Sequence, residues 1–196
     1  MEQRTLDLRL VKAAGHGELE MVQKLLAKGA DIHAWADNAL LQAADHGHLE
    51  VVKYLLVRDG EKADIHGSEQ VLLRAIIGGY VEIAKYLLEK GADVHARNDA
   101  ALRDAVYVCR KEIVKVLATA IFDPESWRGK SRAEIEAYAT ALYESIKADY
   151  PEPDEVAERL QETASVLADC AIDCWHRVRP IPELKISPLP AQPRPV

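Results

Sequence analysis

The sequence has few cysteines, a single phenylalanine and no long apolar run. Its 3 cysteines are few and odd in number, which favours reduced thiols over a disulfide framework. No stretch of about 18 uncharged apolar residues occurs, so we expect no membrane span, no signal peptide and a cytoplasmic protein. A formal net charge of -7 argues against direct binding of nucleic acid, which normally needs a basic face.

The motifs of catalysis are missing as well. The chain has no G-x-S-x-G, H-E-x-x-H, Walker or G-x-G-x-x-G sequence, so we expect no enzyme and no cofactor. Cys170, Cys174 and His176 share a predicted helix, and Cys109 is a conceivable fourth ligand, but this spacing is unusual for zinc. We therefore expect buried thiols and no metal. An enzyme or metal protein using the C-terminal segment stays open as a competing function.

What the sequence does have is an internal repeat. Four copies cover residues 9–120: "RLVKAAGHGELEMVQKLLAKGADIHA", "ALLQAADHGHLEVVKYLLVRDGEKADIHG", "VLLRAIIGGYVEIAKYLLEKGADVHA" and "ALRDAVYVCRKEIVKVLATA". Gly17, Gly47, Gly79 and Cys109 occupy one column and follow each other at 30, 32 and 30 residues. A period this short indicates stacked supersecondary units that bury their apolar faces against one another.

The second copy predicts two short helices joined by a tight turn. Leu40, Ala43 and Ala44 form an apolar face of small residues on the first helix. Gly47 supplies the positive-φ conformation that ends this helix, and an apolar stripe over 49–56 marks the second. Helices of about two to three turns are not stable alone in water, so each unit must pack on the next.

The run A-A-x-x-G-H-L-E-V-V-K-Y-L-L at 43–56 and the turns G-A-D-I-H-A at 29–34 and G-A-D-V-H-A at 91–96 resemble the ankyrin repeat. The period is shorter than usual, and "NALLQAA" stands where the ankyrin signature has T-P-L-H-x-A, so we expect short turns. The resemblance implies an all-α solenoid that binds a partner protein on a concave face formed by the turns and the first helices.

We therefore divide the chain into an ankyrin-type α-solenoid of four helix-turn-helix repeats at 1–120, an acidic two-helix cap at 121–179 and a Pro-rich extended tail at 180–196. Ser131 and Glu134 have capping-box spacing at the start of the first cap helix, and Asp154 is the expected N-cap of the second. The apolar stripes expected to pack on the array are Ile135, Ala139, Leu142 and Ile146, then Val156, Leu160, Ala164, Leu167, Ala171 and Cys174 or Trp175.

The resemblance places partner contacts at positions that the fold leaves free. Trp35 is the strongest candidate, because a tryptophan on a short turn has little core to enter and binding energy concentrates in Trp, Tyr and Arg. The alternative is that Trp35 packs along a neighbouring turn. By alignment, the expected contact residues are Trp35, Asp37, Gln42, Asp45 and His46 from the second unit, Gln70, Arg74 and Ile77 from the third, and Arg97, Arg103 and Tyr107 from the fourth.

Histidines recur in one column, at His33, His66 and His95. Equivalent positions of a solenoid lie one repeat apart, so we expect these imidazoles to form hydrogen bonds within their turns and not to share a metal. His16 and His46 precede the helix-ending glycines and are candidates to face a partner.

These patterns predict an interaction module that binds another protein through its concave face and inhibits or scaffolds it. The alternative is a nucleic-acid mimic, because residues 134–173 hold 11 acidic side chains against Lys147 and Arg159. A homodimer through the cap helices also stays open. The tail has two readings, a polyproline ligand for another protein or a strand that lies on this chain through Ile181, Leu184, Ile186 and Leu189.

Overall fold

The computed structural model describes residues 2–58, 69–108, 110–149 and 157–178. Within these residues the chain forms ten helices and no strand, which confirms the expected all-α solenoid. The helices are α1 (Glu2–Gly15), α2 (Leu19–Ala27), α3 (Ala34–Asp45), α4 (Leu49–Arg58), α5 (Glu69–Gly78), α6 (Val81–Glu89), α7 (Ala96–Tyr107), α8 (Lys111–Ile121), α9 (Arg132–Lys147) and α10 (Ala157–Val178).

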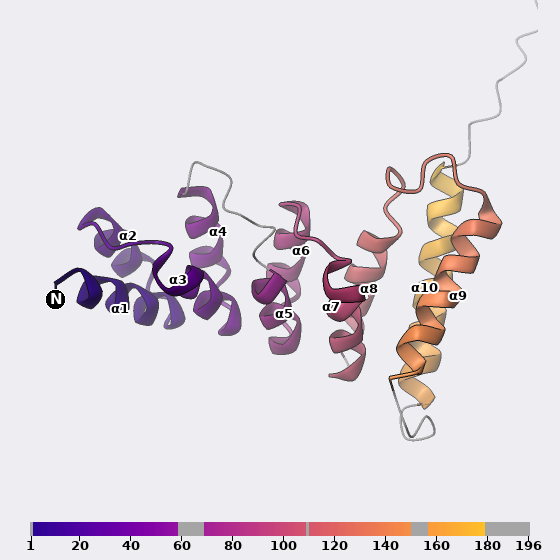
Figure 1. The fold of residues 1–196 in the computed structure, drawn as a ribbon, viewed down its shortest axis with the longest axis horizontal. Coiled ribbons are helices and arrows are strands. Elements are labelled where there is room, and N and C mark those ends of the chain that lie inside the picture. Colours follow the sequence, from indigo (N-terminus) through magenta and orange to yellow (C-terminus); the bar gives the residue numbers. More distant parts are fainter. Residues whose placement is uncertain (1, 59–68, 109, 150–156, 179–196) are drawn as a thin grey trace, which may run out of the picture.

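The first eight helices form four helix-turn-helix units that stand in a row, followed by the longer pair α9 and α10 (Figure 1). The first helices α1, α3, α5 and α7 pack on one another in one layer, and the second helices α2, α4, α6 and α8 pack in another. We call the exposed side of the first layer the first-helix face. Small side chains allow this close stacking: Ala43, Ala75 and Ala105 occupy equivalent positions and are each 0% exposed.

The turn between the two helices of a unit is fixed by a glycine that also receives a side chain from the next unit. Gly47 has a φ of +80°, and the ring of Tyr80 lies directly against it. Gly17 has a φ of +75° and lies against the imidazole of His48, whose Nε2 is 3.0 Å from the carbonyl oxygen of Gly15. Each of these positions therefore requires glycine for two reasons, the left-handed backbone and the close approach of the neighbouring unit.

The N-terminal helix is tied to the first turn by an almost buried carboxylate. Asp7 is 8% exposed, and its Oδ1 accepts hydrogen bonds from the backbone N–H of Asp31 at 2.8 Å and from Nε2 of Gln3 at 2.9 Å. Nε2 of Gln3 also donates to the carbonyl oxygen of Gly29 at 2.9 Å. These bonds hold the loop between α2 and α3 against α1.

We expect Asp7→Ala to lower the free energy of unfolding by about 1 to 3 kcal/mol, because a partly buried N–H loses its charged acceptor. Asp7→Asn keeps an oxygen at Oδ1 and is expected to lose less than half as much. Urea unfolding of the three proteins measures the difference. Equal losses in the two variants would show that the volume of the side chain matters and the hydrogen bond does not.

The pair α9 and α10 covers the end of the row. The predicted capping box is confirmed: Ser131 Oγ accepts from the N–H of Glu134 at 3.3 Å, and Glu134 Oε2 accepts from the N–H of Ser131 at 2.8 Å. The predicted stripe on α9 is buried as expected, and α10 packs on both α9 and α8. Asp154, Val156 and the tail lie outside the described residues.

Candidate functional site

The turns that lead into α3 and α7 share one hydrogen-bond pattern. Nδ1 of His33 lies 2.6 Å from Oδ1 of Asp37, and Nδ1 of His95 lies 2.8 Å from Oδ1 of Asp99. The backbone N–H of each histidine also donates to the carboxylate two residues earlier, at 3.0 Å and 2.9 Å. Both imidazoles therefore bond within their own turns, as the sequence predicts, whereas His66 lies outside the described residues.

The same turns carry left-handed backbone at residues other than glycine. Trp35, Ala36 and Asp37 have φ values of 53°, 56° and 58°, and Arg97 and Asp99 have 52° and 60°. Each such residue costs roughly 1–2 kcal/mol relative to right-handed backbone. Strain of this kind persists where surrounding bonds impose it, and it often accompanies functional sites. Here the histidine–aspartate bonds bracket the strained residues.

Trp35 projects from this turn and remains 47% exposed. Asp37 is held by His33, so its carboxylate is occupied within the turn while its side chain stays half exposed. Arg97 occupies the position equivalent to Trp35 in the fourth unit, and its Nε donates to Oε2 of Glu69 at 3.0 Å. The N-terminal end of the first-helix face thus presents one large aromatic ring and one paired guanidinium.

The C-terminal ends of the first helices carry the other exposed predicted residues. Ile77 is 46% exposed and Tyr107 is 70% exposed, at equivalent positions of the third and fourth units. In the second unit this position is Asp45, whose Oδ1 is 3.6 Å from Nη1 of Arg74 in the next unit. His46 is exposed, and its Nδ1 lies 2.9 Å from the carbonyl oxygen of Gln42.

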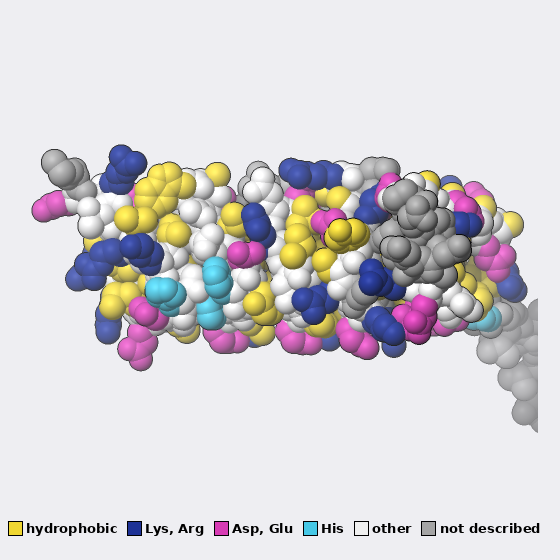
Figure 2. Space-filling view, turned by 90° about the horizontal axis from the view of Figure 1, so that it is seen from below, with side chains coloured by type: hydrophobic (Ala, Val, Ile, Leu, Met, Phe, Trp, Pro, Cys, Tyr) yellow, Lys and Arg dark blue, Asp and Glu magenta, His cyan; other side chains and the backbone are white. Residues whose placement is uncertain are grey.

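Seen from the side of the turns that join first and second helices, this edge of the array mixes charged and hydrophobic side chains along its whole length (Figure 2). Histidines gather over the first two units in the same view. The rings of His46 and His48 stack with their centroids 6.4 Å apart. Gln70 on α5 is exposed, whereas Gln42 on α3 is only partly exposed.

Arg103 differs from the other predicted contact residues, because its side chain bonds to residues of the cap. Its Nη2 donates to Oγ of Ser145 at 2.6 Å, its Nη1 donates to the backbone carbonyl oxygen of Ser145 at 3.3 Å, and it forms an ion pair with Asp149. The side chain is only 20% exposed. Arg103 therefore joins α7 to α9 and is not available as a partner contact.

An aromatic cluster forms the other joint between the array and the cap. The rings of Phe122, Trp127 and Tyr138 lie 5.0 to 6.1 Å apart, and Nε1 of Trp127 donates to the carbonyl oxygen of Ile121 at 2.9 Å. The hydroxyl of Tyr138 reaches Nδ1 of His95 at 3.5 Å. Burial raises the pKa of the Tyr138 hydroxyl, and the carboxylate of Asp99 raises it further. The last strained turn therefore packs against α9.

The two described cysteines lie on α10. Cys174 is 1% exposed, and Sγ of Cys170 is 3.9 Å from Oγ1 of Thr119 on α8. Burial raises the pKa of both thiols above the ordinary range, so they stay protonated at neutral pH. The described part of the chain brings no three His, Cys, Asp or Glu side chains into an arrangement suited to a metal ion. Cys109 lies outside it.

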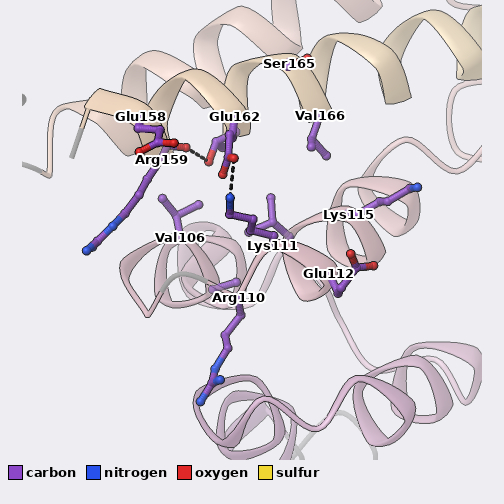
Figure 3. A pocket seen from close by; sticks show the side chains of 13 residues that line it. Val106, Arg110, Lys111, Glu112, Lys115, Glu158, Arg159, Glu162, Ser165 and Val166 are labelled. Atoms are coloured by element: carbon purple, nitrogen blue, oxygen red, sulfur yellow. Dashed lines mark hydrogen bonds and ion pairs between the residues drawn. The ribbon is translucent and has the colours of Figure 1, made fainter.

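A groove of about 470 Å³ lies between α10 and the pair α7 and α8, and its lining includes Val106, Val114 and Val166. Figure 3 shows the side chains that line it. Lys111 reaches across this groove from α8 and pairs with Glu162 on α10 (Figure 3). The groove is thus crossed by an ion pair within the chain, and its rim carries side chains of both signs.

The acidic side chains of the cap have basic neighbours. Within the described part of residues 134–173, six of them form ion pairs. Four of these pairs lie within or beside the cap helices, and two reach Arg103 and Lys111 of the array. Such pairing reduces the continuous negative surface that a nucleic-acid mimic would need. The pairs are Glu134 with Lys130, Glu136 with Arg132, Glu144 with Lys147, Asp149 with Arg103, Glu162 with Lys111 and Asp173 with Arg177.

Sequence reasoning missed the links between units. The pairs of Arg74 with Asp45 and of Arg97 with Glu69 join neighbouring first helices, and no local pattern marks them. A sequence pattern does mark the strained turns, because Asp-x-His-x-x-x-Asp occurs at both 31–37 and 93–99.

Among the helices that the structure describes, none has the length and apolar character needed to cross a membrane.

Comparison with known proteins identifies the array. A family model of ankyrin repeats matches residues 10–98 in 3 copies. No curated protein matches the sequence significantly. Beyond the matched residues, α7 and α8 continue the same design, since α7 packs on α5 and α8 packs on α6. Residues 10–98 therefore form ankyrin repeats, which generally mediate protein–protein interaction.

Proposed function

We propose that the chain binds a folded protein through its first-helix face and thereby inhibits or scaffolds that protein. The observation that carries this proposal is the set of large exposed side chains on successive first helices, Trp35, Ile77 and Tyr107. None of them is required by the core. Trp and Tyr are the residue types in which interface energy concentrates.

The spread of these residues favours a folded partner over a short peptide. The regular part of α3, residues 38–45, is about 11 Å long at 1.5 Å per residue. The axes of α3 and α7 are two helix spacings apart, which is about 20 Å. A partner that contacts both Trp35 and Tyr107 must therefore present an extended surface. Asp45, Arg74 and Arg97 lie on the same three first helices, α3, α5 and α7, and supply polar contacts to the partner.

We expect the double variant Trp35→Ala, Tyr107→Ala to weaken partner binding by about 2 to 4 kcal/mol while changing the free energy of unfolding by less than about 1 kcal/mol. Capture from a lysate, read by mass spectrometry and followed by titration of the captured protein, measures the first quantity. Thermal unfolding measures the second.

The matched control is the double variant Met21→Ala, Val57→Ala. Both residues are exposed large hydrophobics, at 36% and 68%, but they lie on the second helices α2 and α4. The control is expected to retain the captured protein. Equal capture by the aromatic variant, or a large loss of stability with binding retained, would contradict the proposal and make Trp35 and Tyr107 packing residues.

A further inference from the structure

The seam between α9 and α10 forms a second, smaller groove of about 270 Å³. Its walls are mostly small or apolar and include Ala139 and Tyr143 of α9 with Ala164, Ala168 and Ile172 of α10. Cys170, which faces Thr119 of α8, is about half a helical turn away from both Ala168 and Ile172. The groove therefore opens on the side of α10 that points away from the array.

The dimensions of this groove argue against a second copy of the chain as its occupant. A stable dimer buries about 800 Å² on each partner. Within the described residues of α9 and α10, Ile172 is the one exposed large hydrophobic, at 40%. A narrow seam lined by alanines instead fits one extended strand with a few apolar side chains.

A segment of this composition follows α10 directly. Residues 179–196 hold six prolines and the apolar residues Ile181, Leu184, Ile186 and Leu189. Proline cannot continue a helix, so this sequence favours extended backbone. The segment has three basic residues and one acidic residue, for a net charge of +2, whereas α9 and α10 together hold seven acidic and four basic residues, for a net charge of -3. The two parts therefore attract each other.

The connection is long enough for this strand to reach the groove. Along α10, Ile172 lies about 9 Å before Val178, and Ala164 lies about 21 Å before it. An extended Pro-rich strand advances about 3.1 Å per residue, so the eleven residues 179–189 cover about 34 Å.

We infer that residues 179–196 dock as an extended strand in the groove between α9 and α10, with their apolar side chains over the alanines of the seam. The strand covers the outer face of the cap and brings its basic residues close to the acidic helices. This inference is independent of the partner site on the first-helix face.

Proteolysis of the full chain tests the inference, because Glu183 is the one glutamate in the segment and a Glu-specific protease cuts after it. Release of the 184–196 fragment is followed by mass spectrometry, with the free 179–196 peptide as reference. We expect cleavage in the full chain to be at least about tenfold slower than in the peptide, since cleavage tracks the undocked population.

Two variants compare the groove with an equivalent surface. Ala168 lines the groove and Ala141 does not, and both alanines are exposed. Ala168→Arg fills the seam with a bulky cation and is expected to restore the rate of the free peptide, whereas Ala141→Arg is expected to stay slow. Thermal unfolding checks that both variants fold. As a check that leaves the helices untouched, Ile181→Ser with Leu189→Ser is expected to release the strand as well.

Three outcomes would overturn the inference. The first is equal cleavage of the full chain and the peptide. The second is slow cleavage that none of the groove or segment variants accelerates. The third is protection that rises with protein concentration together with a dimeric mass by light scattering, because a second copy would then cover the groove.

Discussion

Replacing Gly47 by alanine is expected to lower the free energy of unfolding by about 3 to 4 kcal/mol. Two costs combine at this position. The φ of +80° is left-handed, which costs an L-residue roughly 1–2 kcal/mol. A Cβ on Gly47 would also lie 2.3 Å from Cε1 of Tyr80. The ring cannot simply retreat, because its other edge lies against Gly78, where an added Cβ would be equally close.

Gly29 provides the matched control, because its φ is +89° and an added Cβ would meet nothing within 4 Å. Gly29→Ala should therefore show only the backbone cost, about 1 to 2 kcal/mol. Urea unfolding of both variants separates the two costs. Combining Gly47→Ala with Tyr80→Ala removes the clash, so the losses should be strongly non-additive. Equal losses at Gly47 and Gly29 would show that contact between units contributes nothing.

The second large effect is expected at the joint between the array and the cap. Ile135 on α9 is 0% exposed and belongs to the same apolar core as the helices of the array. We expect Ile135→Ala to destabilise the chain by about 3 to 4 kcal/mol through the lost apolar contacts and the cavity left behind. Ile77→Ala is the matched control, since Ile77 is 46% exposed, and its expected loss is below about 1 kcal/mol.

Hydrogen exchange measures whether the destabilisation by Ile135→Ala extends from the cap helices to the last repeat. If α9, α10 and the last repeat stabilise one another, Ile135→Ala should accelerate amide exchange in α8 as well as in α9 and α10. Faster exchange confined to α9 and α10 would instead make them an independent unit. The bonds of Arg103 to Ser145 and Asp149 and the cluster around Tyr138 favour the first result.

The repeat and its helices could be predicted from the sequence because their causes are local. Apolar spacing marked the buried stripe of α9, Gly47 marked the turn after α3, and Ser131 with Glu134 marked a helix start. Each depends on residues within one or two turns of each other, and repetition at a period of about 30 residues adds independent evidence for the same design.

The sequence by itself also predicted a binding function, because its repeat matches the ankyrin repeat, which generally mediates protein–protein interaction. It also proposed Trp35 and Tyr107 as partner contacts, and both are exposed large side chains on first helices. Whether they contact a partner stays a prediction.

Only the tertiary structure showed which of the predicted contact residues are covered by other parts of the same chain. Arg103 and Arg74 were both predicted as partner contacts, yet Arg103 is bonded to the cap, whereas Arg74 pairs with Asp45 and remains half exposed. The repeat pattern specifies which positions face outward from one unit. Which of these a later segment covers depends on contacts between residues more than 40 positions apart, such as Arg103 and Ser145, and no periodicity encodes those contacts.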